Sequence, residues 1–310
     1  GIPPDEVVLV QPRAIPKTSS GKLRRSACKQ NYLDRKMGHR APAVRWQIVK
    51  LFCISALKKI GRWFGVVWKL IYNVYLGMMI LITLMPTWLA FILAPREKAA
   101  RIVRVWSRWI LRLGLCPLTV RGANYLIKNH AVIYVANHTS YIDMLVLMSV
   151  LPPDGGFVGK KELLKIPLFK SVIKHLEFIT VDRLDFAKSQ IDAEKIADVL
   201  ASGRSVIIFP EGTFSYATGI RPFKLGAFKI ATATGRTISP VAIRGARKIL
   251  RADSFLIKPA AVTVTIGEPL EPQGTDWDEI VRLREAARLE IAKHSGEQTI
   301  DLILAGLPSE

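Results

Sequence analysis

Between residues 70 and 94 the chain has no charged side chain, so this stretch is suited only to an apolar environment. A membrane-spanning helix needs about 20 apolar residues, and the stretch is long enough to supply them. Pro86 lies within it, and lysines and arginines flank both of its ends. Because cytoplasmic loops concentrate Lys and Arg, this symmetry predicts that both ends lie on the cytoplasmic face. We favour a bent, interfacial or re-entrant anchor over a full span or a buried core helix.

The preceding residues, 40–69, mix basic and apolar side chains, which predicts a cationic amphipathic helix lying on a membrane. The whole chain carries a net charge of +20, and half of its residues are hydrophobic. Such a chain fits an anionic membrane surface. Nucleic acid is the other usual partner of this much positive charge, but the sequence contains no nucleic-acid-binding motif. We expect a membrane-associated protein on the cytoplasmic face, which would be the inner membrane in a bacterium.

From about residue 106 onward, short apolar runs alternate with stretches of helical spacing. The runs predict strands near residues 118–120, 131–136, 178–181, 205–209, 238–243 and 261–266. The stretches predict helices near residues 141–150, 168–175, 187–201, 226–234 and 276–293. Strands that alternate with helices are typical of α/β folds. We therefore predict a mixed, largely parallel sheet flanked by helices and preceded by a membrane-associated helical segment.

The most informative motif, residues 137–143, follows directly on the apolar run 131–136. His138 and Asp143 lie five positions apart at the expected start of a helix. Histidine supplies a base that works near neutral pH, and a carboxylate can orient its ring and stabilise the charged form. The carboxyl ends of strands in α/β sheets are also where ligands bind. The alternative is that Ser140 caps the helix and Asp143 lies in its first turn, with no catalytic role.

A second motif, Pro210-Glu211-Gly212-Thr213, follows the apolar run 205–208. With it, the chain from about residue 106 to residue 270 resembles the glycerolipid acyltransferase family, which includes the lysophosphatidic acid acyltransferases. Four blocks carry the resemblance in the order that the family has them: residues 138–143, 159–183, 209–226 and 239–241. A His and an Asp five positions apart would be a weak signal alone, whereas four ordered blocks are specific.

The resemblance implies direct acyl transfer from an acyl-CoA or an acyl carrier protein to the free hydroxyl of 1-acyl-glycerol 3-phosphate, giving phosphatidic acid. His138 would be the general base and Asp143 would orient its imidazole, as the acid does in a serine-hydrolase triad. The acceptor hydroxyl is itself the nucleophile, and the sequence contains no Gly-x-Ser-x-Gly motif. We expect no metal and no cofactor, only the acyl thioester as co-substrate. Backbone N–H groups near Gly212 or at the helix start are candidates for binding the oxyanion.

The acceptor phosphate calls for arginine or lysine. The resemblance nominates Arg183, and it assigns Glu211 to positioning the acceptor or organising the site. Phe214 stands where much of the family has an arginine, so the phosphate contacts stay open. Gly212 and Thr213 are expected to shape the turn of the second motif, and Asn137 is expected to brace the histidine loop. Residues 240–241 are expected to be structural and to form a wall of the acyl pocket. The predicted substrate-binding residues are Glu211, Gly212, Thr213, Arg183, Lys160, Arg221 and Lys224.

Residues 1–40 form a separate piece, in which Thr18-Ser19-Ser20-Gly21-Lys22 is a polar loop followed by cations. It resembles the closing loop of the adenylate-forming enzymes (acyl-CoA synthetases and acyl-AMP ligases), in which a lysine at the place of Lys22 serves adenylation. The nucleotide-binding body of that family is missing, and the chain begins at Gly1, so we expect a fragment of a longer protein. We predict three segments: a ligase remnant at 1–40, anchoring helices at 41–105 and an acyltransferase domain at 106–310.

Two alternatives remain open. The acceptor could be glycerol 3-phosphate, another lysophospholipid or a lipid without phosphate, in a parent protein that also has acyl-AMP or acyl-CoA ligase activity. The chain could instead be a membrane-binding module without catalysis, although His138, Asp143 and Glu211 argue against that reading.

Overall fold

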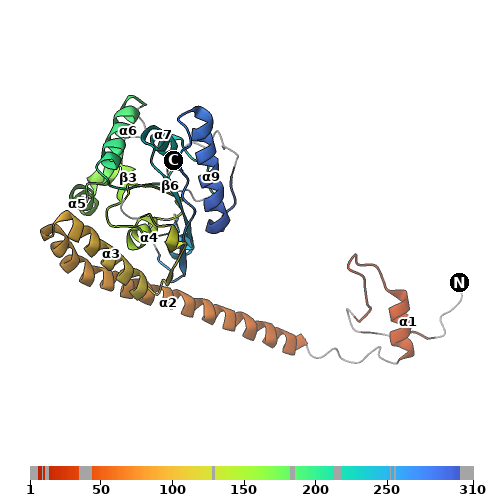
Figure 1. The fold of residues 1–310 in the computed structure, drawn as a ribbon. Coiled ribbons are helices and arrows are strands. Elements are labelled where there is room, and N and C mark those ends of the chain that lie inside the picture. The colour runs from red at the N-terminus through yellow and green to blue at the C-terminus, as the bar shows by residue number, and fades with distance from the viewer. Residues whose placement is uncertain are drawn as a thin grey trace. The chain divides into compact units, whose positions relative to one another are not determined.

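The computed structural model describes residues 6–8, 10, 14–34, 44–127, 130–181, 186–212, 218–251, 253–254 and 256–300. Contacts divide the chain into two compact units, residues 1–67 and 68–310. Figure 1 shows both units, with several of their elements labelled.

The first unit contains a tight turn followed by the short helix α1 (Arg25–Leu33). An antiparallel bridge pairs Lys17 with Leu23. Inside it, the backbone N–H of Thr18 donates to the carbonyl of Lys22 at 2.8 Å. Gly21 has a φ of +79°, a conformation that glycine adopts without steric cost. The polar loop of the sequence is therefore an ordered turn that presents Lys22 just before α1.

Helix α2 (Val44–Leu93) begins in the first unit and ends in the second, and Pro86 lies inside it without ending it. By length and composition alone, its part Lys50–Leu93 is apolar enough to cross a membrane, and only 11% of its most apolar window is buried. Within the second unit one side of α2 is buried, including Tyr72, Leu76 and Phe91. The opposite side exposes large apolar side chains such as Leu81 and Met85, at 66% and 63%. Exposed apolar surface of this extent is unfavourable in water, and it is consistent with membrane association.

Helix α3 (Arg96–Leu113) runs back along the end of α2. The Tyr72 hydroxyl donates to the carbonyl of Gly114 at 2.6 Å, and the Trp106 indole N–H donates to the Thr83 hydroxyl at 3.1 Å. We call residues 68–113 the helical hairpin. Asn73 links it to a distant loop, because its side-chain amide bonds both the carbonyl and the N–H of Ile257, at 3.0 and 2.9 Å.

Seven strands within the described residues form one sheet in the order β1-β7-β6-β2-β5-β3-β4. They are β1 (Leu118–Arg121), β2 (Ile133–Ala136), β3 (Gly156–Lys160), β4 (Ile179–Val181), β5 (Val206–Ile208), β6 (Ile238–Arg244) and β7 (Val262–Ile266). Neighbouring strands are parallel except for β6 and β7, which are antiparallel. The predicted mixed, largely parallel sheet is confirmed.

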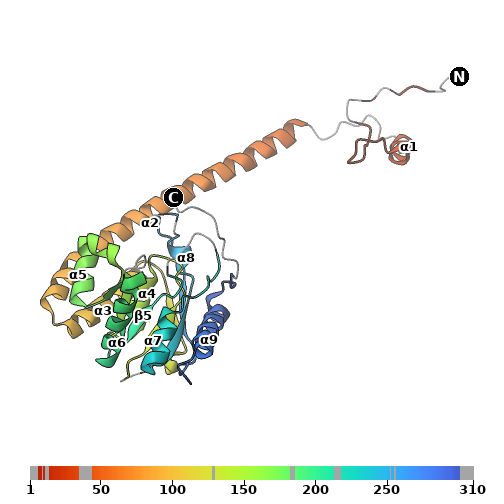
Figure 2. The same ribbon diagram turned by 90° about the horizontal axis from the view of Figure 1, so that it is seen from above.

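Helices cover both faces of this sheet, as Figure 2 shows from above. On one face, α6 (Phe186–Ala201), α7 (Gly226–Thr234) and α9 (Trp277–Ser295) pack against the side chains of Ile133 and Val135. On the other face, α3, α4 (Asp143–Val150) and α8 (Ala246–Ile249) pack around Val132, Tyr134 and Ala136. The alternation of β2 side chains between two fully buried cores explains why its run is apolar throughout. The remaining elements are α5 (Pro167–His175) and the 3-10 turns η1 (Ala123–Tyr125) and η2 (Lys161–Lys165).

The six predicted strands and five predicted helices of the second unit are present with bounds shifted by a few residues. Strand β3 and helix α3 were not predicted. The division between units falls after residue 67, inside the predicted anchoring segment 41–105, and the three segment boundaries of the sequence stay predictions.

Candidate active site

The two motifs meet because the strands that precede them are neighbours. β2 pairs with β5 in parallel, with Ile133 opposite Val206 and Val135 opposite Ile208. The carboxyl ends of parallel neighbours lie at the same edge of a sheet. Residues 137–143, after β2, and residues 209–212, after β5, are therefore brought together although about seventy positions separate them. β2 also lies at the centre of the sheet, where the strand connections diverge and ligand crevices form.

His138 and Asp143 form a hydrogen-bonded pair at this edge. The ring Nδ1 of His138 lies 3.0 Å from Oδ2 of Asp143. The same carboxylate oxygen accepts the backbone N–H groups of Thr139 and Ser140, at 2.6 and 2.8 Å. The Asp143 side chain is fully buried, whereas 19% of the His138 side chain is exposed. A carboxylate at Nδ1 favours the tautomer that carries its proton there, so Nε2 is the basic nitrogen.

Glu211 ties the two motifs together through backbone groups. Its Oε1 accepts the N–H of His138 at 2.8 Å, and its Oε2 accepts the N–H of Arg221 at 3.2 Å. Burial raises the pKa of the Glu211 carboxyl to about 7, against the lowering effect of the two backbone hydrogen bonds. Glu211 thus organises the main chain of the site, which is one of the two roles that the sequence predicted for it.

Buried polar contacts fix the loop of His138 from behind. The Asn137 side chain accepts the N–H of Ile243 at 2.7 Å and donates to its carbonyl at 3.0 Å. The Ser140 hydroxyl donates to the carbonyl of Leu250 at 2.7 Å. The ring of His138 stacks on Phe209, with centroids 4.2 Å apart and planes inclined by 19°. The predicted bracing by Asn137 is present, and the imidazole is held on one face by an aromatic ring.

The helical hairpin holds the other end of α4, the helix that Asp143 begins. Arg104 donates from Nη2 to the carbonyl of Val150, and Arg108 donates from Nε to that of Ser149, both at 2.7 Å. These carbonyls lie in the last turn of α4, where no intrahelical N–H is left to bind them. Positive charge also interacts favourably with a helix C-terminus. α4 is therefore held at both ends, by its own acid at the start and by α3 arginines at the end.

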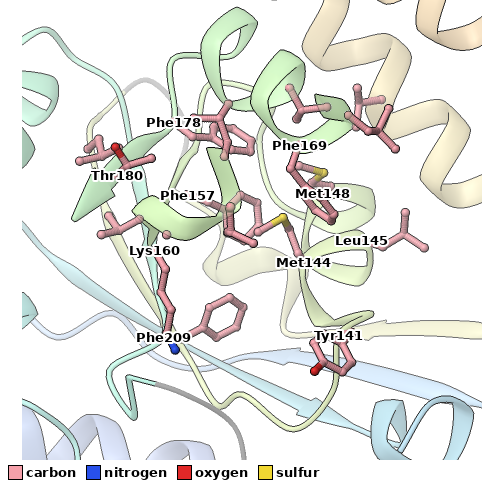
Figure 3. A pocket seen from close by; sticks show the side chains of 18 of the residues that line it. Tyr141, Met144, Leu145, Met148, Phe157, Lys160, Phe169, Phe178, Thr180 and Phe209 are labelled. Atoms are coloured by element: carbon pink, nitrogen blue, oxygen red, sulfur yellow. The ribbon is translucent and has the colours of Figure 1, made fainter. Parts of the chain in front are cut away.

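A cavity of about 580 Å³ lies beside the His138 ring. Its walls come from the hairpin, α4, β3, α5 and β4, and they are almost entirely apolar. Figure 3 shows Met144, Met148, Phe157 and Phe178 around its interior, with Phe209 and Tyr141 at one end. A mostly apolar space beside a basic nitrogen suits an acyl chain whose reactive carbonyl lies at the histidine.

The other predicted binding residues are distributed around this end. Lys160 lines the cavity at the end of β3, and its side chain extends toward Phe209 (Figure 3). Gly212 also lines it, with a φ of +84°, and a Cβ there would lie 3.0 Å from Cε of Lys224. Lys224 therefore covers the turn after Glu211, while Arg221 contributes its backbone N–H to Glu211. Arg183 and Thr213 lie outside the described residues.

Three of the N–H groups near the predicted oxyanion positions are already bonded within the fold. The N–H of Gly212 donates to the carbonyl of Phe209 at 3.0 Å, and the N–H groups of Thr139 and Ser140 are held by Asp143. These three N–H groups are committed to the fold and do not point to a developing oxyanion. Residues 240–241 do not line the cavity. They lie inside β6 because that strand is buried on both faces.

The residues that the sequence did not identify are the cavity walls and the α3 arginines. The cavity is assembled from elements far apart in the chain, and each contributes only one or a few apolar side chains. Phe209 could have been found, since it directly precedes the second motif. Among the described residues, no cluster of three or more His, Cys, Asp or Glu side chains could hold a metal ion.

The site is thus a paired histidine and aspartate beside a mostly apolar cavity of an α/β domain. Residues 117–244 match the protein-family model described as Acyltransferase. The match covers all four blocks, so the predicted resemblance to this family is confirmed for that part of the chain.

Proteins named 1-acyl-sn-glycerol-3-phosphate acyltransferase are similar to the chain. The one from Cocos nucifera is 31% identical over 164 residues, which are 53% of this chain and 52% of that protein. The one from Salmonella typhimurium is 38% identical over 112 residues, 36% of this chain and 46% of that protein. The chain thus spans about half the length of these curated relatives.

The fold also matches a solved structure. The crystal structure of the 1-acyl-sn-glycerophosphate (LPA) acyltransferase from Thermotoga maritima superposes with a TM-score of 0.62 at 24% identity, covering 73% of this chain and 96% of that one. At this identity the likeness concerns the fold.

Proposed function

We propose that this chain is an acyltransferase that moves an acyl group from an acyl-CoA or acyl carrier protein to the free hydroxyl of 1-acyl-glycerol 3-phosphate, giving phosphatidic acid. The single observation that carries the proposal is the His138–Asp143 pair at the end of a 580 Å³ apolar cavity. The relatives named as 1-acyl-sn-glycerol-3-phosphate acyltransferases support the choice of acceptor.

In the proposed reaction, Nε2 of His138 takes the proton of the acceptor hydroxyl as its oxygen forms a bond to the thioester carbonyl carbon. Asp143 holds the ring through Nδ1 and stabilises the imidazolium that results. The tetrahedral intermediate collapses with cleavage of the C–S bond, and the imidazolium returns the proton to the departing thiolate. The products are an ester and a free thiol, and no covalent acyl-enzyme forms.

Lys160 is the proposed cation for negative charge at the reacting end of the cavity, because it lines the cavity and extends toward Phe209. Lys224 lies over Gly212 and is proposed to contact the acceptor phosphate together with Arg183 and Arg221. Gly212 and Thr213 are proposed to contribute to acceptor binding beside Lys224. Lysine and arginine both bind phosphate, and arginine adds a bidentate geometry.

The helical hairpin and the rest of α2 are proposed to hold the domain on the cytoplasmic face of an anionic membrane. Residues 1–40 are proposed to be the end of an adenylate-forming ligase domain, since their ordered turn presents Lys22 as that family's closing loop would. The ligase part of a longer protein would activate the fatty acid, and the acyltransferase part would use it.

The test is an acceptor panel with the full chain in mixed micelles. One labelled acyl-CoA and one acyl carrier protein thioester are offered 1-acyl-glycerol 3-phosphate, glycerol 3-phosphate, another lysophospholipid and monoacylglycerol. We expect the first acceptor to give the highest kcat/KM. A preference for an acceptor without phosphate would contradict the proposal.

The phosphate contacts are tested by kinetics of three variants, Arg183→Ala, Lys160→Ala and Lys224→Ala. Each should raise the KM for the phosphate-containing acceptor more than the KM for the acyl donor. Lys195→Ala, an exposed change on α6, is the matched control and should change neither. Equal effects on both substrates would remove the residue concerned from the phosphate site.

A further inference from the structure

An exposed apolar and basic segment lies at the start of α5. We call it the α5 rim: Lys165, Ile166, Pro167, Leu168, Phe169 and Lys170. All six residues are exposed in a row. Ile166, Leu168 and Phe169 expose 47%, 40% and 38% of their surface. Large apolar side chains gathered in this way on a soluble surface mark an interaction site.

The α5 rim is also part of the wall of the active-site cavity. Leu168 and Phe169 line the cavity while remaining exposed at the surface, so they lie where it opens. The facing wall includes Leu84 and Trp88 of the helical hairpin. Figures 1 and 2 both show α5 beside the hairpin and α9 on the other side of the sheet. A surface that contacts the exposed side of the hairpin would therefore also reach the α5 rim.

The charges around the rim indicate what that contact is. Along the chain, the apolar side chains are flanked by Lys161, Lys165, Lys170 and Lys174, and Glu162 is the one acid between residues 161 and 174. Apolar side chains with a border of lysines are typical of segments that insert shallowly at an anionic lipid surface. A surface that binds a protein partner would instead be expected to have fewer charged residues near the centre of its apolar patch.

We propose that the α5 rim is a second membrane contact, separate from the helical hairpin, which rests on an anionic bilayer at the mouth of the cavity. Ile166, Leu168 and Phe169 enter the apolar layer, and the lysines bind lipid phosphates. An acyl chain then passes between the bilayer and the cavity without crossing water. The inference rests on the proposed function only in assuming that the hairpin is membrane-bound.

The experiment measures how deeply a label at a single residue enters the bilayer. Binding of the whole chain to a vesicle would not test the rim, because α2 alone would keep the chain there. Cys28 and Cys53 are changed to Ser in the full chain, and the buried Cys116 is kept. A fluorescent label is placed by Ile166→Cys on the rim, by Met78→Cys on the exposed side of the hairpin, or by Leu289→Cys on α9. Met78 and Leu289 are each 58% exposed and apolar, which makes them matched controls.

Vesicles contain phosphatidylcholine and phosphatidylglycerol, with or without bromine on the acyl chains.

We expect the brominated lipid to quench the labels at 166 and 78 about equally and to leave the label at 289 unquenched. In the same background Lys165→Glu with Lys170→Glu should remove most of the quenching at 166, because the ratio of inserted to withdrawn rim falls about fivefold for each unit of positive charge lost. The same reversal at Lys195 and Lys229, on α6 and α7, should leave it unchanged.

Quenching at 78 without quenching at 166 would overturn the second contact while leaving the membrane-bound hairpin intact. Quenching at all three positions, or at none, would also overturn it. A change at 166 on adding an acidic carrier protein or more of the chain itself, without vesicles, would assign the rim to a protein partner. Acyl transfer by each labelled chain is measured in parallel in micelles, so failure of the proposed reaction is seen independently of quenching.

Discussion

The carboxylate of Glu211 accepts the backbone N–H of His138 at 2.8 Å, so the acid of one motif holds the main chain of the other. Its second oxygen accepts the N–H of Arg221, and only 7% of the residue is exposed. Three separate stretches of chain therefore depend on one buried acid. A change at Glu211 should therefore disturb the geometry of His138.

The first prediction concerns the pH dependence of stability. Burial raises the pKa of Glu211 to about 7, whereas a glutamate in an unfolded chain titrates near about 4.3. Between these values the folded protein keeps a proton that the unfolded chain releases, so the free energy of unfolding falls as the pH rises. The fall due to Glu211 should be on the order of 3 kcal/mol across this window. Urea unfolding in detergent at a series of pH values measures it.

Glu211→Gln should flatten this slope, because glutamine does not titrate. Glu97→Gln, an exposed change in the first turn of α3, is the control and should keep the slope of the original chain. An unchanged slope in Glu211→Gln would show that this acid is already ionised in the folded protein at low pH.

The second prediction concerns the proposed base. His138→Ala should lower kcat by about 10²–10⁴-fold, the usual contribution of general-base assistance. Asp143→Asn should cause a loss of similar size, because an amide does not stabilise the imidazolium. Vesicle binding should be unchanged in both variants. His294→Ala, on α9, is the matched control and should keep its activity; retained transfer in His138→Ala would remove the histidine from the chemistry.

The third prediction concerns the arginines that hold the end of α4. Arg104→Met keeps most of the apolar stem and removes the donor to the Val150 carbonyl. We expect the free energy of unfolding to fall by about 1–2 kcal/mol, since a charged hydrogen bond to a helix C-terminus is lost. Arg101→Met, at an exposed position of the same helix, should cost less than about 0.5 kcal/mol. Equal effects would mean that the Arg104 contact does not stabilise the fold.

The fourth prediction concerns the length of the acyl chain. Met148 points into the cavity from α4 (Figure 3), and Met148→Trp would fill part of that space. Competition between long-chain and short-chain acyl-CoA should then shift toward the short chain by roughly tenfold. Val105→Trp, at a 51% exposed position on α3, should leave the ratio unchanged. An unchanged ratio in Met148→Trp would place the acyl chain elsewhere.

Local patterns were enough to predict six of the seven described strands and to place each motif at a strand end, because each motif directly follows a continuous apolar run. They did not predict that β2 and β5 are neighbours, which is what brings the two motifs together. Strand β3 escaped prediction since Gly156 and Gly159 break its apolar run and Lys160 ends it. The residues of helix α3 were interpreted only as basic residues that flank the apolar stretch. In the structure, Arg104 and Arg108 of this helix donate to backbone carbonyls of α4. Pro86 suggested an interruption, but a proline within a long helix was tolerated here.

The cavity could not be predicted from the sequence. Its walls combine single side chains from the hairpin, α4, β3, α5 and β4, and no local spacing records which of these face one another. The same limit applies to the candidate oxyanion donors. The sequence places N–H groups near Gly212 and at the start of α4, but only the folded chain reveals that Phe209 and Asp143 already accept those of Gly212, Thr139 and Ser140.

The side chain of Asn137 pairs with the N–H and carbonyl of Ile243 as a neighbouring strand would. β2 pairs with β6 only as far as Ala136, so one residue's amide replaces the next rung of the ladder. The main chain is thereby released from the sheet one position before His138, and its N–H can turn to Glu211. A hydrophobic residue at 137 would leave two buried peptide groups of β6 without partners, and it would draw the histidine's own backbone back toward the strand.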